Sequence, residues 1–140
     1  MAIILTQTDT TVGFLSQDKR KLQTIKSRPS TKEFIKVYKN FLALNIRVPK
    51  NRHKMLRRSK KTSFIVKNRA FRVAVDNLHS QVLRANSWNF SSSANESGQN
   101  YKREFCVQKA DIIIEDKSSL FEGEASTLLK MNTKKIRKLR

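Results

Sequence analysis

The spacing of apolar residues along the chain predicts more strand than helix. Short runs in which apolar and β-branched residues stand together or alternate with polar residues are typical of strands. Two of these runs are separated by residues 67–69, a length that suits a hairpin turn. The predicted strands cover residues 2–5, 34–38, 62–66, 70–75, 110–114, 126–131 and 136–140, and one more begins at Trp88 and continues into a serine-rich segment.

Helical spacing is confined to a few segments. In residues 17–25, apolar residues recur three positions apart among charged ones, and Pro29 ends this pattern. A second apolar stripe, in residues 78–83, follows a candidate N-cap at Asp76 or Asn77. Shorter helices are expected within residues 40–45 and 47–61. The pattern as a whole predicts a mixed α/β fold, with a twisted, mostly β sheet flanked by helices.

Composition narrows the class of protein. The chain has 140 residues, which favours a single domain over residues 1–140. It carries 30 Lys and Arg against 11 Asp and Glu, which gives a net charge of +19. Because like charges repel in the folded state, this charge indicates an anionic partner such as nucleic acid or nucleotide phosphates. A lone Cys106, and two histidines in separate segments, speak against a disulfide framework or a zinc site and fit a reducing cytoplasm. No apolar run of the length needed to span a membrane is present.

Two polar segments are the candidates for chemistry. Lys26-Ser27-Arg28-Pro29 places an ammonium and a guanidinium two residues apart, and in an extended segment both would point to the same side. Such a pair suits a triphosphate, although in so basic a chain it also fits a solvated helix end. Residues 91–98, Ser-Ser-Ser-Ala-Asn-Glu-Ser-Gly, offer hydroxyl and amide groups and little bulk. They suit close approach to a base or phosphate, or a polar turn that ends a strand.

In this order, the two segments resemble the K-x-R-P and S-x-N segments of the YrdC-type (TsaC) threonylcarbamoyladenylate synthase family, both of which face a nucleotide triphosphate. Further matches follow the same order along nearly the whole chain. They are Thr8-Asp9-Thr10 with Gly13, Lys32, Thr62, Arg72, residues 110–113, residues 123–129 and residues 139–140.

This resemblance implies an activity and a set of roles. Members of the family combine threonine, bicarbonate and ATP into threonylcarbamoyl-adenylate and pyrophosphate, and a separate transferase complex places the threonylcarbamoyl group on tRNA. By resemblance, Lys26 and Arg28 are the catalytic residues, and they hold the phosphates together with Lys32 and Mg²⁺. Thr62, Ser93, Asn95 and Arg140 complete the ATP site. Thr8, Arg72 and Ser126 bind threonine, with Arg72 on its carboxylate. The fold implied is YrdC-like, with a basic concave face.

The chain also departs from the family pattern. Gln7, Val12, Val37 and Lys130 stand where the family usually has other residues, mostly on the threonine side. Two alternatives to the synthase therefore remain open. One is an RNA-binding protein of the same fold that has lost catalysis, and the other is a ribosome-associated basic protein without a small-molecule site.

Residues 47–61 form a basic block that has no counterpart in the family pattern. The block holds eight Lys or Arg and no acid. Because like charges repel, an anionic surface would stabilise such a cluster. We expect it to contact tRNA, double-stranded RNA or an acidic partner protein of the transferase complex, the alternative being a solvated helix. The candidate RNA-binding residues are Arg52, Lys54, Arg57 and Arg58.

Overall fold

A computed structural model describes residues 2–27, 34–74, 87–96, 98–117 and 119–140. Its strands form one mixed sheet in the order β7-β1-β2-β6-β3-β5-β4-β8-β9. The pairs β1·β7, β3·β5 and β4·β8 are parallel, and the other neighbours are antiparallel. The strands are β1 Ile4–Gln7, β2 Val12–Ser16, β3 Ile35–Tyr38, β4 Thr62–Val66, β5 Arg69–Val73, β6 Trp88–Ser93, β7 Ile112–Ile114, β8 Thr127–Met131 and β9 Ile136–Lys138.

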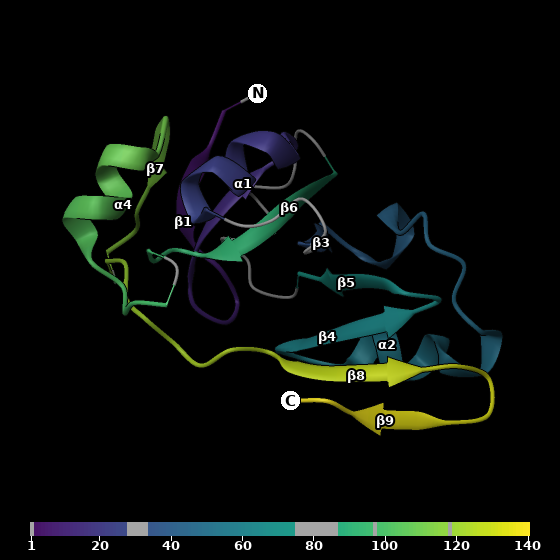
Figure 1. The fold of residues 1–140 in the computed structure, drawn as a ribbon. Helices are drawn as coiled ribbons and strands as arrows, with labels where there is room; N and C mark the ends of the chain where they lie inside the picture. Colours follow the sequence, from purple (N-terminus) through teal and green to yellow (C-terminus); the bar gives the residue numbers. More distant parts are fainter. Residues whose placement is uncertain (1, 28–33, 75–86, 97, 118) are drawn as a thin grey trace.

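Two apolar cores lie beneath helices on the sheet. Helices α1 (Lys19–Lys26) and α4 (Arg103–Lys109) pack beside β1 and β2, where Leu22 and Cys106 join the buried side chains of those strands. Helix α2 (His53–Arg58) follows the short 3₁₀ turns η1 (Phe41–Ala43) and η2 (Lys50–Arg52). Its Leu56 packs on β4 and β5 at the other end of the sheet (Figure 1).

Alternation along the strands sends polar side chains to the opposite face. In β5, Phe71 is buried under α2, whereas its neighbour Arg72 lies on the other side of the sheet. In β4, Phe64 belongs to the core and Ser63 points away from it, toward Ser126. The face without α1, α2 and α4 is therefore the one that can carry a polar site.

Most of the predicted elements are confirmed with small shifts of their ends. The mixed α/β class is correct, and the two runs around residues 67–69 do form a hairpin, β4–β5. Its turn has two residues rather than three, Lys67 at φ 50° and Asn68 at φ 64°, because Arg69 already pairs in β5. Positive φ at both central residues is the turn geometry that matches strand twist. The helix expected at residues 78–83 lies outside the described residues.

Two elements, β2 and α4, were not predicted from the sequence. Strand β2 is buried at all five positions, so it shows no alternation of apolar and polar residues. Helix α4 begins at Arg103, and the preceding Lys102 makes no side-chain capping hydrogen bond. The extended conformation in which Lys26 and Arg28 would point to the same side does not hold at Lys26, which is the last residue of α1. In the part of the chain that the structure describes, no helix is long and apolar enough to cross a membrane.

Helix α1 depends on its N-cap. The Asp18 carboxylate accepts hydrogen bonds from the backbone N–H groups of Arg20 and Lys21, and it is the negative charge at a first turn that otherwise holds only cations. Asp18→Ala should therefore lower the free energy of unfolding by about 1 kcal/mol. Urea denaturation measures the change. Asp18→Asn, which can still accept both bonds, should recover most of it, and an equally unstable Asn variant would contradict the assignment.

Candidate functional site

A cavity of about 440 Å³ opens on the sheet face opposite α1, α2 and α4. Its walls come from the turn between β1 and β2, from strands β3, β4, β5 and β6, from the start of β8 and from the C-terminus. The side chains that matter below are Thr8, Thr10, Arg72, Ser93, Ser126 and Arg140. All of them are polar, and two are permanently cationic.

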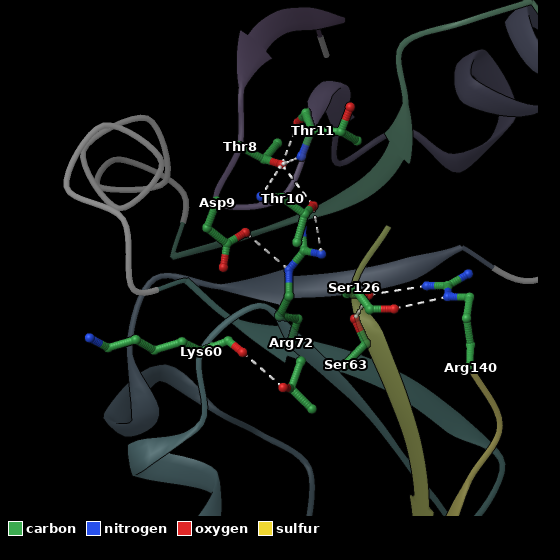
Figure 2. A network of polar contacts seen from close by, with 10 residues as sticks. Thr8, Asp9, Thr10, Thr11, Lys60, Ser63, Arg72, Ser126 and Arg140 are labelled. Carbon is green, nitrogen blue, oxygen red and sulfur yellow. Dashed lines mark hydrogen bonds and ion pairs between the residues drawn. The ribbon is translucent and has the colours of Figure 1, made fainter. Parts of the chain in front are cut away.

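Arg72 is the buried charge of this cavity. Its side chain is 6% exposed, and its Nε lies 3.3 Å from Asp9 Oδ1 in the β1–β2 turn (Figure 2). Its Nη1 donates a hydrogen bond of 3.2 Å to Thr10 Oγ1. Burial lowers the pKa of Arg72, the Asp9 carboxylate counteracts that change, and the nearby Arg140 cation adds to it. An arginine remains protonated at neutral pH even so, and the cavity is therefore lined by two cations, of which Arg72 is paired with Asp9.

Ser126 connects the second cation to the strands. Arg140 donates from Nε to the Ser126 carbonyl oxygen at 2.9 Å and from Nη2 to Ser126 Oγ at 3.1 Å. Ser126 Oγ is also 2.7 Å from Ser63 Oγ in β4 (Figure 2). The chain end is thus fixed at the cavity by two bonds of one guanidinium, and that guanidinium lies beside the Arg72 wall.

Thr8 closes the turn that faces Arg72. Its hydroxyl donates to the Thr11 carbonyl oxygen at 2.6 Å and accepts from the backbone N–H groups of Thr10 and Thr11 at 3.3 Å. This local bonding is the usual way in which a hydroxyl holds a tight turn. The turn in this way presents Asp9 and Thr10 to the arginine.

Residues 121–126 cross over this turn and form the rim of the cavity. Gly123 N donates to Thr11 Oγ1 at 2.8 Å, and Phe121 N donates to Gln7 Oε1 at 3.0 Å. A Cβ at Gly123 would collide with the carbonyl oxygen of Thr10, so the two backbones approach as only glycine allows. In Figure 1 this segment runs from the α4 side of the molecule to β8.

Lys26 holds the serine segment at the end of β6. Its ammonium donates to the carbonyl oxygens of Ser93 and Asn95 at 3.0 and 2.8 Å, and to Asn95 Oδ1 at 2.7 Å. Ser93 Oγ also donates to Asn95 Oδ1, at 2.7 Å. Lys26 itself is 3% exposed. Ser93 lines the main cavity and also an adjoining hollow of about 270 Å³, which Asn95 and Tyr101 line too.

The structure brings together five of the residues that the sequence singled out for small-molecule binding. Thr8, Arg72, Ser93, Ser126 and Arg140 all line the main cavity. Lys26 and Asn95 lie behind and beside it, joined through Ser93. Thr62 does not line the cavity, and its hydroxyl donates to the Lys60 carbonyl oxygen at 2.9 Å (Figure 2). Arg28 and Lys32 lie outside the described residues.

The four candidate RNA-binding residues lie elsewhere, on η2 and α2. Lys54, Arg57 and Arg58 are exposed. Arg57 stacks its guanidinium 4.4 Å from the centre of the Phe41 ring. Arg52 instead donates to the carbonyl oxygens of Asn132 and Thr133 and so helps to fix the β8–β9 turn.

Sequence reasoning missed several members of the site. Asp9, the partner of Arg72, stood inside a quoted motif but received no role, and Thr10 likewise. Ser63 was also missed, although a hydroxyl within the apolar run of β4 is a signal that could have found it. Among the described residues, no group of three or more His, Cys, Asp or Glu could hold a metal ion.

Comparison with known proteins identifies the fold through solved structures and not through sequence. No protein-family model and no curated protein matches the sequence. Among solved structures, P. abyssi Sua5 complexed with L-threonine aligns with 99% of this chain at a TM-score of 0.79 and 16% identity. E. coli YciO aligns at 0.78 with 14% identity, and MTH1692 from Methanobacterium thermoautotrophicum at 0.71 with 18% identity. This chain has the Sua5/YrdC fold.

The coverage of these neighbours differs. The alignment spans 50% of the Sua5 chain, 82% of YciO and 79% of MTH1692. The chain is thus about half the length of the Sua5 proteins it matches. The expected YrdC-like fold is confirmed, and at these identities the likeness establishes the fold alone.

The crossing at Gly123 can be tested by adding one methyl group. Gly123→Ala should lower the free energy of unfolding by about 1–3 kcal/mol, the usual range for overpacking, because the Thr10 backbone must move. Thermal or urea denaturation measures it. Glu124→Ala, at an exposed neighbouring position, is the matched control and should change stability little. Equal effects of the two substitutions would argue against the close approach.

The role of Lys26 can be separated from simple loss of charge. Lys26→Met removes all three hydrogen bonds of the ammonium to the oxygens of Ser93 and Asn95, and should lower the free energy of unfolding by about 2 kcal/mol. Arg20→Met removes a cation from the exposed side of the same helix and should cost much less. If both variants were equally stable in urea, Lys26 would not hold the serine segment.

Proposed function

We propose that this protein is an L-threonylcarbamoyladenylate synthase, which converts threonine, bicarbonate and ATP to threonylcarbamoyl-AMP, pyrophosphate and water. The observation that carries the proposal is the gathering of Thr8, Arg72, Ser93, Ser126 and Arg140 around one cavity. The likeness to a Sua5 structure with L-threonine bound supports the choice of threonine. No acid–base pair is required, because the reaction depends on positioning and on charge neutralisation.

The charges of the cavity suit the substrates. A threonine carboxylate and the phosphates of ATP are both anions, and Arg72 and Arg140 provide two cations against the single Asp9 carboxylate. Arg72 is held by Asp9 and Thr10, so its guanidinium is oriented before a ligand arrives. A buried, pre-oriented arginine loses little freedom on binding a carboxylate. We assign the threonine carboxylate to Arg72, with Thr8 and Ser126 beside it.

The nucleotide belongs at the serine segment in this proposal. Ser93 lies where the cavity meets the adjoining hollow, so a ligand longer than an amino acid can extend from one into the other. Lys26 acts there by holding the backbone of residues 93–95, and its fixed charge lies behind the same backbone. Arg28 and Lys32 are the proposed phosphate ligands from the preceding segment.

The reaction needs the carbamate and the α-phosphate side by side. The threonine amine takes up the carbon of bicarbonate, with loss of water, and a carbamate oxygen then attacks the α-phosphorus. The bond from that phosphorus to the pyrophosphate oxygen breaks in line with the attack. The chain contributes by holding the threonine carboxylate at Arg72 and the nucleotide at Ser93, which fixes the approach of the two reactants.

Mg²⁺ fits this site as a companion of ATP. The described residues that line the main cavity include hydroxyls and arginines but no carboxylate. Because Mg²⁺ prefers oxygen ligands and often keeps phosphates and waters around it, the triphosphate itself would supply most of its ligands. When bound, the ion neutralises charge on the phosphates.

The direct test is product formation. Purified protein incubated with ATP, Mg²⁺, threonine and bicarbonate should release pyrophosphate and form threonylcarbamoyl-AMP, detectable by mass spectrometry. Omission of threonine or of bicarbonate should abolish both signals. Absence of product with all four present would favour the alternative of an RNA-binding protein that has lost catalysis.

The assignment of Arg72 needs a variant that leaves no unpaired buried charge. Asp9→Asn with Arg72→Gln removes both charges of the buried pair, which should spare the fold. We expect the KM for threonine to rise about 10- to 100-fold, the scale of a hydrogen bond to a charged group, with the KM for ATP little changed. Asp9→Asn alone keeps the cation but leaves it buried without its carboxylate, so this control is compared at a temperature where circular dichroism shows it folded; it should then retain most of the threonine affinity. If the two KM values rose together in the double variant, Arg72 would belong to the nucleotide site.

A further inference from the structure

The net charge of the chain comes from two segments of the sequence. Residues 34–74 and 125–140 together hold 19 Lys or Arg and no Asp or Glu, whereas the rest of the chain holds 11 of each sign. These two segments contain α2 and the strands β3, β5, β4, β8 and β9, which are neighbours in the sheet. Among the described residues, the boundary between this cationic half of the sheet and the other, balanced half therefore falls between β6 and β3.

Two basic stretches that are far apart in the sequence meet at the far edge of the cationic half. Asn51 Nδ2 donates to the Thr133 carbonyl oxygen at 3.0 Å, and Arg52 Nε donates to the Asn132 carbonyl oxygen at 3.0 Å. These bonds fix η2, directly before α2, against the β8–β9 turn (Figure 1). We call the exposed cations on the two sides of this contact the cationic edge: Lys54, Arg57, Arg58, Lys134 and Lys135.

Specific contacts hold parts of the cationic edge in place, and no acidic residue within the two segments neutralises its charges. Backbone N–H groups of Lys134 and Lys135 both donate to Asn132 Oδ1 at 2.8 Å, which shapes the turn that carries them. Arg57 is held over the Phe41 ring. Because the two segments contain no acid, the folded state brings like charges together at a cost that an anionic partner would remove.

The amount of charge indicates the kind of partner. ATP in the cavity would bring only about four negative charges, and no residue of the cationic edge lines the cavity. A polyanion that supplies one charge per nucleotide can neutralise cations along the whole edge and releases its counterions as it does so. The choice of RNA rests on the proposed function, whose product is used on tRNA.

We propose that the cationic edge is a docking surface for the phosphate backbone of RNA. It lies apart from the cavity, so a bound RNA would leave the small-molecule site open. Arg52 belongs to the support of this surface, because its guanidinium fixes the turn that carries Lys134 and Lys135.

The test compares two sets of charge removal of equal size. The edge variant carries Lys54→Gln, Arg58→Gln, Lys134→Gln and Lys135→Gln. The control variant carries Arg20→Gln, Lys102→Gln, Lys109→Gln and Lys117→Gln, four exposed cations in the balanced half. Both have the same net charge, so a difference between them reports position and not total charge. Fluorescence anisotropy with labelled tRNA measures affinity over a series of salt concentrations.

The edge variant should bind tRNA at least about tenfold more weakly near 0.15 M salt. The slope of log affinity against log salt concentration should be less negative than that of the wild type by about 3 to 4, since each phosphate contact contributes ~0.9 to the slope. The control variant should keep the wild-type slope. Equal losses in the two variants, or none in the edge variant, would overturn the proposal. So would poly-glutamate that displaces tRNA at matched charge concentration, because it would indicate an acidic protein as partner.

Pyrophosphate release, measured on the same variants without RNA, separates this inference from the proposed function. An edge variant that releases pyrophosphate at the wild-type rate, but whose tRNA affinity depends less steeply on salt, supports both the synthase and the docking surface. Wild-type protein that binds tRNA through the edge but forms no product would refute only the synthase. Wild-type protein that forms product, and whose tRNA binding is unaffected in the edge variant, would refute only the docking surface.

Discussion

The buried ion pair between Arg72 and Asp9 is the constraint on which the candidate site depends. Arg72 lies on β5 and Asp9 in the turn after β1, with β2, β6 and β3 between them in the sheet. The pair therefore spans one face of the sheet, and Thr10 joins it through Arg72 Nη1. Removing one partner would leave the other charge buried, which typically costs about 3–5 kcal/mol. A cavity with this pair in its wall keeps its shape only while the turn of residues 8–11 stays in place, and Gly123 and the Thr8 hydroxyl hold that turn.

Elements could be predicted from the sequence where a short run of apolar residues stands out from polar residues on both sides. β4 and β5 stand out as short apolar runs around a polar turn, and both are present. β2 is covered on both faces, so burial removes the alternation that identifies a strand. Lys26 shows the limit of a local rule. Proline restricts the residue directly before it, here Arg28, and does not prevent Lys26 from ending a helix.

Local sequence patterns also predicted the site only in part. Thr8, Arg72, Ser93, Ser126 and Arg140 were named from motifs in a certain order, and the fold brings them to one cavity. Thr62 and Ser63 are neighbours in β4, yet strand alternation gives only Ser63 a contact with Ser126. A motif match that is off by one residue thus selects the wrong face of a strand. The Arg72–Asp9 contact joins residues distant in sequence, and no periodicity within either segment encodes it.

The cavity lies at the boundary between the two charge halves, and this position has a consequence for how an anion binds. Most of its hydroxyl groups, those of Thr8, Thr10, Thr11 and the serines at 91–93, come from the balanced half, and its two lining cations, Arg72 and Arg140, come from the cationic half. An anionic group that enters is drawn toward the arginine wall, which orients a ligand with one charged end before any specific contact forms. At physiological salt, the Debye length is about 8 Å, so exposed cations farther away than that are largely screened from the cavity. Within the cationic half, the cavity therefore depends on Arg72 and Arg140, and the exposed cations of that half that lie farther away are available to a larger anionic partner.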